Sequence, residues 1–261
     1  MALKKPTIVV FDMDGTTVRH LNPVILTLCE WYDDAGYMLS KLLDWAIRRR
    51  LRGPIIPDVD LDRDMQVQKR LLVHKAIHKL RRRSVDKIVE PCPGIFQVLN
   101  FLKSHDIPMG LVSNGLGKGY GHEVLTTFEL EGYYRATVFR EDISKAKPHP
   151  EPILLALREM GVELKPDDII WYLGDRHKDI TAALAARPHL PCDIVPIAVG
   201  VNAAVAAIEK GLGPEHVIMS YKDMFGRLKT LLGTPKAAAL SANTQRLIDP
   251  VIPRVAGGKR R

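Results

Sequence analysis

The feature that constrains the fold most is a short apolar run that stops abruptly at two carboxylates. Ile8 to Phe11 are β-branched or aromatic without polar alternation, as in a strand buried on both faces of a parallel sheet. Asp12, Asp14 and Gly15 follow at once. Side chains at the carboxyl end of such a strand face the crevice where open α/β sheets bind ligands. Paired carboxylates there favour a divalent metal, because hard cations prefer oxygen ligands; the alternative is a turn or a helix N-cap.

Chain length and composition narrow the class of protein. The 261 residues, 46% of them hydrophobic, suffice for one large domain or for a core with an inserted module. No apolar run approaches the ~18 residues that cross a bilayer, so we expect no membrane association. The first residues carry no recognisable export signal, which favours the cytoplasm. Cys29, Cys92 and Cys192 lie far apart, which predicts neither a disulfide framework nor a zinc site.

The net charge of +8 is concentrated in three clusters, at residues 48–52, 79–83 and 259–261. Such clusters can bind nucleic acid or anionic substrates. More often they are the solvated faces of helices, and we favour that interpretation.

The chain contains two kinds of sequence pattern. Residues 19–89 have helical periodicity and no convincing strand, which predicts an all-helical cap domain. Residues 1–18 and 90–234 alternate between strand and helix patterns, which predicts a Rossmann-like parallel sheet with helices on both faces. Because the cap is inserted after the first strand, it should cover the edge where the carboxylates lie. Residues 235–261, rich in Ala, Pro, Gly and basic residues, are predicted to form a flexible basic tail.

The predicted α/β part can be divided further. The strands expected after the first are 108–112, 136–139, 169–173, 194–199 and 216–219. The expected helices are 95–103, 122–130, 150–160, 179–186, 203–209 and 224–232.

Three later points place polar side chains at a predicted strand end or helix start, namely Ser113-Asn114, Lys147, and the pair Asp175 and Asp179. Singly, each has an ordinary explanation as a helix cap, a surface lysine or a first-turn acid. In this order, after Asp-x-Asp-Gly-Thr, they resemble the four motifs of the haloacid dehalogenase-like hydrolase superfamily. The resemblance covers residues 7–232, and the insertion resembles the C1-type helical cap of the phosphoglycolate phosphatase-like group. Asp-x-Asp-Gly-Thr and Gly-Asp-x-x-x-Asp are specific motifs, whereas Ser-Asn and Lys-Pro alone are weak.

The resemblance implies a Mg²⁺-dependent phosphatase that hydrolyses a small phosphomonoester, such as phosphoglycolate or a sugar phosphate. Asp12 would attack phosphorus and form an aspartyl-phosphate, and Asp14 would act as the acid and then the base. The implied metal ligands are Asp12, Asp14 through its backbone carbonyl, Asp175 and Asp179. The implied phosphate-binding residues are Thr16 (or Thr17), Ser113, Asn114 and Lys147.

Two positions depart from the superfamily pattern. Arg176 stands where Ser or Thr is common, and it could contact a substrate anion or pair with Asp179. Residues 115–121 contain four glycines. This stretch could form a phosphate-binding nest, but we favour a mobile loop.

Three other functions compete with this interpretation. A phosphomutase of the β-phosphoglucomutase kind would share all four motifs. A nucleic-acid-binding protein could use the arginine clusters, although the sequence shows no recognised nucleic-acid-binding motif. A catalytically silent interaction protein is disfavoured by the complete motif set. The sequence leaves open the substrate and the choice between monomer and homodimer.

Overall fold

The computed structural model describes residues 3–21 and 85–233. The predicted cap helices, the basic clusters at 48–52 and 79–83, Cys29 and the C-terminal tail therefore lie outside the described residues.

The core is a six-stranded sheet in which every neighbouring pair is parallel. Its spatial order is β5 (Ala136–Val138), β4 (Met109–Val112), β1 (Ile8–Asp12), β6 (Ile169–Gly174), β7 (Asp193–Val199) and β8 (Val217–Ile218). The central strand β1 pairs Asp12 with Val112 of β4 and Phe11 with Leu173 of β6. The carboxyl ends of three strands therefore meet at one edge. The predicted parallel α/β fold is confirmed.

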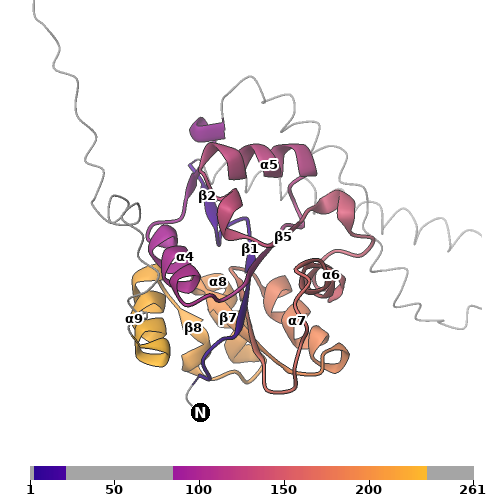
Figure 1. The fold of residues 1–261 in the computed structure, drawn as a ribbon, viewed down its shortest axis with the longest axis vertical. Coiled ribbons are helices and arrows are strands. Elements are labelled where there is room, and N and C mark those ends of the chain that lie inside the picture. Colours follow the sequence, from indigo (N-terminus) through magenta and orange to yellow (C-terminus); the bar gives the residue numbers. More distant parts are fainter. Residues whose placement is uncertain (1–2, 22–84, 234–261) are drawn as a thin grey trace, which may run out of the picture.

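Helices cover both faces of this sheet (Figure 1). α4 (Ile95–Ser104) and α9 (Tyr221–Leu232) pack on one face. α6 (Glu151–Glu159), α7 (His177–Ala186) and α8 (Gly200–Glu209) pack on the other. α5 (Lys118–Thr127) lies beyond the carboxyl end of the sheet (Figure 1). Among the described helices, none is long and apolar enough to span a membrane.

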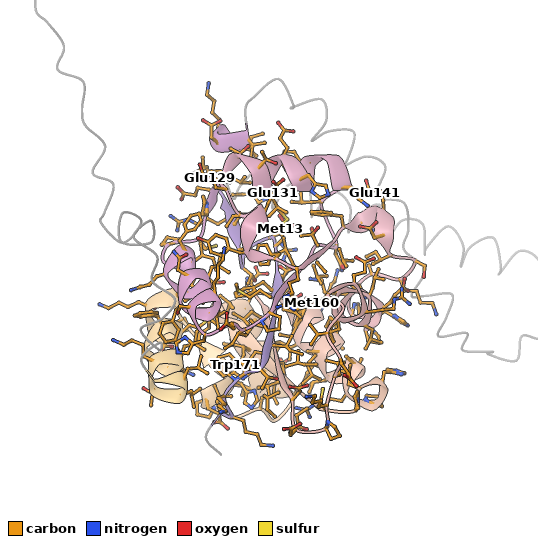
Figure 2. The ribbon with its side chains drawn as sticks, viewed as in Figure 1. Met13, Glu129, Glu131, Glu141, Met160 and Trp171 are labelled. Carbon is orange, nitrogen blue, oxygen red and sulfur yellow. The ribbon has the colours of Figure 1, made fainter. Side chains whose placement is uncertain are left out.

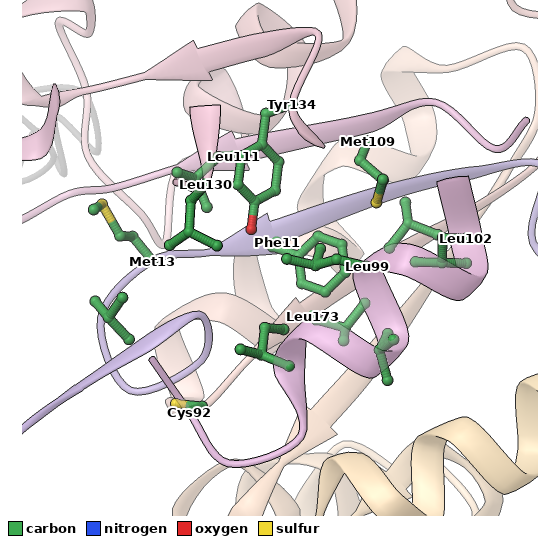
Figure 3. Packing of buried hydrophobic residues seen from close by; sticks show 14 of the residues in the cluster. Phe11, Met13, Cys92, Leu99, Leu102, Met109, Leu111, Leu130, Tyr134 and Leu173 are labelled. Carbon is green, nitrogen blue, oxygen red and sulfur yellow. The ribbon is translucent and has the colours of Figure 1, made fainter. Parts of the chain in front are cut away.

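The two hydrophobic cores follow from the alternation of side chains along β1. Val9 and Phe11 face the layer of α4 and α9, whereas Ile8 and Val10 face the layer of α6 and α7. Phe11 is fully buried among the side chains of Figure 3 and makes an edge-on ring contact with Tyr134, with ring centroids 6.1 Å apart.

The hydrophobic core on the side of α4 and α9 extends along the whole length of β1. Met13 lies towards its carboxyl end and Trp171 towards its amino end (Figure 2). Burial of one large apolar side chain stabilises the fold by about 1.5–3 kcal/mol. The core contacts therefore fix β1 in place up to the end that carries Asp12.

A second, two-stranded sheet was not predicted. β2 (Val18–His20) and β3 (Val89–Pro91) pair antiparallel, and Arg19 forms an ion pair with Glu90 at 2.7 Å. The amide of Leu21 also donates to the carbonyl of Ile88 at 2.9 Å. The two strands contain three residues each and lie far apart in sequence, so local periodicity gave no signal for them.

The prediction of a mobile loop over residues 115–121 is wrong in its second half, because α5 begins at Lys118. The helix also ends earlier than predicted, at Thr127, and Glu129 has a positive φ of 54°. Gly121 serves close packing: a Cβ atom there would lie 2.1 Å from the Phe139 ring. The glycines that suggested a loop therefore include one that lets the helix approach its neighbour.

Candidate active site

The carboxylate of Asp12 is buried at the end of β1 and is ion-paired with Lys147. Lys147 lies in the loop before α6, and its side chain is only 3% exposed. Its ammonium also donates to Oδ1 of Asp179 at 2.7 Å and to the hydroxyl of Tyr172 at 3.0 Å. An ammonium carries three N–H donors, so all three have acceptors within the chain.

Tyr172 closes this network from the buried strand β6. Its hydroxyl donates to Oδ1 of Asp179 at 3.1 Å while it accepts from Lys147. Asp179 sits in the first turn of α7, and its Oδ2 accepts the backbone N–H of Arg176 at 3.1 Å. The N-terminus of α7 and the ammonium of Lys147 thus both fix the position of the Asp179 carboxylate.

Asp14 lies beside Asp12, but its carboxylate contacts different partners. The hydroxyl of Ser113, at the end of β4, donates to Oδ2 at 3.3 Å. Nε2 of His20, on β2, lies 3.7 Å from Oδ1. Oδ1 is buried and has no hydrogen-bond partner in the described part of the chain. This carboxylate is therefore less constrained than that of Asp12 and has one oxygen available.

Asn114 joins the end of β4 to the lysine loop. Its side-chain amide donates to the backbone carbonyl of Lys147 at 3.2 Å and accepts from the backbone N–H of Lys147 at the same distance. This reciprocal pair fixes the backbone of Lys147. The side chain of Asn114 is thus occupied in positioning the lysine.

Gly15 brings the first loop against Asp175. It has a φ of +82°, and a Cβ atom there would lie 2.1 Å from Oδ2 of Asp175. Only glycine fits both conditions without displacing the carboxylate.

The two threonines differ in their partners. Thr17 donates its hydroxyl to the backbone carbonyl of Asp12 at 2.8 Å. Thr16 is fully buried, and its hydroxyl has no hydrogen-bond partner among the residues that the structure describes. Thr16 therefore has the available donor.

Burial raises the pKa of Asp12 well above its usual value, opposed by Lys147 and reinforced by the neighbouring carboxylates. Burial, followed by the charge of Asp179, raises the pKa of Asp175 to about 7. Burial alone would lower the pKa of Lys147, but Asp12 and Asp179 raise it well above its usual value. The carboxylates of Asp12, Asp175 and Asp179 thus outnumber the single ammonium of Lys147.

A divalent cation fits that excess. Oxygen atoms of Asp12, Asp175 and Asp179 lie within 4.8 Å of one another. Oδ1 of Asp175 is buried, and no described residue forms a hydrogen bond with it. A set made only of carboxylate oxygens suits a hard cation such as Mg²⁺.

Arg176 lies next to both aspartates of the last motif. Its Nε lies 3.9 Å from Oδ2 of Asp175, and its backbone N–H donates to Oδ2 of Asp179 at 3.1 Å.

Sequence reasoning missed two neighbours of the site, Tyr172 and His20. Tyr172 carries the signal of a polar tip within an otherwise apolar strand, two positions before Gly174-Asp175. His20 gave no signal, because its strand was not predicted.

Known proteins resemble this chain in sequence and fold. The haloacid dehalogenase-like hydrolase family matches residues 9–189. Pyrophosphatase PpaX of Oceanobacillus iheyensis is 25% identical over 219 residues, which cover 83% of this chain and 94% of that protein. Phosphoglycolate phosphatase of Escherichia coli O157:H7 is 29% identical over 175 residues, and the match spans 64% of each protein, less than two thirds of that relative. The crystal structure of a hydrolase of the same superfamily from Ehrlichia chaffeensis superposes with a TM-score of 0.54 at 20% identity, covering 88% of this chain and all of that one.

Proposed function

Since the chain belongs to the haloacid dehalogenase-like hydrolase family, we propose that it is a Mg²⁺-dependent phosphatase of a small phosphomonoester. The observation that carries the proposal is the buried Asp12 carboxylate, ion-paired with Lys147 beside a second carboxylate, Asp14. The names of the relatives, phosphoglycolate phosphatase and pyrophosphatase PpaX, support a small phosphorylated metabolite as the substrate class.

Asp12 is the proposed nucleophile. A carboxylate oxygen attacks phosphorus, the bond to the leaving oxygen breaks, and an aspartyl-phosphate remains. Lys147 favours the ionised form of Asp12 and fixes its orientation. Covalent catalysis of this kind divides one difficult displacement into two easier ones.

Asp14 is the proposed acid–base group. It gives a proton to the leaving alkoxide and then takes one from the water that hydrolyses the aspartyl-phosphate. Its weaker constraint suits this role, because none of the described residues gives Oδ1 a hydrogen bond. The hydroxyl of Ser113 holds Oδ2 in place.

The proposed metal ligands are the carboxylates of Asp12, Asp175 and Asp179 and the backbone carbonyl of Asp14. When bound, Mg²⁺ supplies positive charge that offsets the phosphate and the crowded carboxylates.

The phosphoryl oxygens are proposed to contact Thr16, Ser113, the backbone N–H of Asn114 and Lys147. Fixed donors of this kind stabilise the charge that develops on these oxygens. Since the three N–H groups of Lys147 already have acceptors, a phosphoryl oxygen would replace one of them.

Residues 19–89, apart from those that belong to β2 and β3, are proposed to form a helical cap over this edge and to recognise the leaving portion of the substrate, as lids do. We place the enzyme in the cytoplasm.

The test is phosphate release across a panel of phosphoglycolate, sugar phosphates, nucleotides and pyrophosphate, with Mg²⁺ or with excess EDTA. We expect hydrolysis that requires the cation. Asp12→Asn should lower kcat by several orders of magnitude with the fold retained. Asp193→Asn makes the same chemical change at an exposed aspartate paired with Lys4 and should leave kcat unchanged.

Near wild-type turnover by Asp12→Asn, or full activity in EDTA, would contradict the proposal. Isomerisation of a sugar phosphate without net phosphate release would instead identify a mutase.

A further inference from the structure

His20 is carried towards the acid–base carboxylate by the short ribbon of β2 and β3. Along β2, Val18 is buried, Arg19 is exposed and His20 is partly buried. Because side chains alternate along a strand, His20 points to the same side as Val18. Arg19 points the other way and pairs with Glu90.

The ribbon holds His20 firmly. His20 pairs with Val89 across the ladder, and the next amide, that of Leu21, donates to the carbonyl of Ile88 at 2.9 Å. The turn that leads into β2 is closed by Gly15, whose amide donates to the carbonyl of Val18 at 2.8 Å. The position of the imidazole relative to the first motif is therefore set by backbone hydrogen bonds on both sides.

The imidazole faces Oδ1 of Asp14, the oxygen that receives no hydrogen bond from residues 3–21 or 85–233. Nε2 of His20 lies 3.7 Å from Oδ1, while Ser113 donates to Oδ2. The separation of 3.7 Å is longer than a hydrogen bond, so the two groups are close neighbours without a direct hydrogen bond in this geometry. The two carboxylate oxygens of Asp14 thus have neighbours from two different places, His20 on β2 and Ser113 at the end of β4.

We propose that His20 is a positioning residue for Asp14, an assignment that rests on the proposed phosphatase function. The Nε2–H group orients the carboxylate so that its proton can reach the leaving oxygen. The effect should depend on the leaving group, because protonation matters most when a poor leaving group such as an alkoxide departs. p-Nitrophenolate leaves without that help. A merely structural role would affect both kinds of substrate equally.

The experiment compares kcat/KM for an alkyl phosphate from the active panel with kcat/KM for p-nitrophenyl phosphate. The variants are His20→Leu, which removes the donor, and His20→Gln, whose side-chain amide retains one. Arg19→Gln is the control, since it changes the neighbouring side chain on the opposite side of the same strand. Thermal unfolding of each variant reports on the fold.

For His20→Leu we expect kcat/KM to fall at least about tenfold with the alkyl phosphate and less than about twofold with p-nitrophenyl phosphate, since acid–base catalysis as a whole contributes about 10²–10⁴-fold. His20→Gln should recover most of the loss, and Arg19→Gln should show none. Equal losses on both substrates, or no loss, would overturn the role of His20 alone. An inactive wild-type enzyme would overturn the proposed function and this assignment with it. Should His20→Leu fail to fold, His20→Ala, which also lacks the donor, takes its place: a ratio of alkyl phosphate to p-nitrophenyl phosphate kcat/KM several-fold below that of Arg19→Gln supports the assignment, and an unchanged ratio overturns it.

Discussion

In protein freed of divalent cations, the carboxyl of Asp175 should make the fold less stable as the pH rises. Burial raises its folded-state pKa from 3.8 to about 7. Between these values the folded state binds more protons than the unfolded state, so the free energy of unfolding falls with rising pH. The stabilisation is present in full below 3.8 and is lost as the pH rises through about 7. The shift corresponds to about 4 kcal/mol, at 1.36 kcal/mol per pKa unit.

The assay is urea unfolding in EDTA at several pH values between 4 and 8, for wild type and for Asp175→Asn. The amide cannot ionise, so the variant should gain stability relative to wild type by up to about 4 kcal/mol across this range. Adding Mg²⁺ should stabilise wild type most above pH 7, where the carboxylate is ionised, and should have little effect on the variant.

Asp193→Asn is the matched control, because Lys4 lowers the pKa of this exposed aspartate and its pH dependence has the opposite sign. Unfolding free energies of wild type and Asp175→Asn that run parallel from pH 4 to 8 would refute the reasoning. Such a result would mean that the Asp175 carboxyl lacks the raised pKa that burial and neighbouring carboxylates should give it.

Three further results are expected from unfolding experiments. Lys147→Met leaves two buried carboxylates without their cation and should destabilise the fold by about 3–5 kcal/mol near neutral pH; a cost that does not shrink in acid, where the carboxyls protonate, would contradict this. Gly121→Ala should destabilise by about 1–3 kcal/mol because its Cβ meets the Phe139 ring, whereas Gly119→Ala, two residues earlier on the same helix and facing open space, should be neutral or stabilise by up to about 1 kcal/mol. Phe11→Ala should cost about 3–5 kcal/mol in urea unfolding, and a cost under 1 kcal/mol would show that the ring is not part of the core.

The parallel sheet could be predicted because each of its longer strands is a local apolar run that ends in polar residues. β1 and β6 are buried along their whole length, so their sequences show it without knowledge of their partners. Parallel strands bring their carboxyl ends to one edge, and the motif positions Asp12, Ser113 and Asp175 therefore come together.

The features that were missed depend on partners distant in the chain. β2 pairs with β3 across 71 positions, and three residues are too few to show a period. Tyr172 looks like an ordinary core residue until Lys147, 25 positions away, is seen to contact its hydroxyl. The start of α5 was misplaced because glycine is unfavourable in helices, and only the contact of Gly121 with Phe139 explains its presence there.

The β2–β3 ribbon also makes the length of the intervening chain almost irrelevant to the core. Leu21 and Ile88 are held within hydrogen-bonding distance, so a segment of any size can leave and return there without stretching the sheet. The entropy of closing a flexible loop grows only with the logarithm of its length, by about 0.6 kcal/mol per doubling. A change in the number of residues between 21 and 85 should therefore alter this closure entropy only slightly, whereas the buried Val85 belongs to the core. The length of the chain between β2 and β3 can therefore change while Asp14 and His20 stay in register.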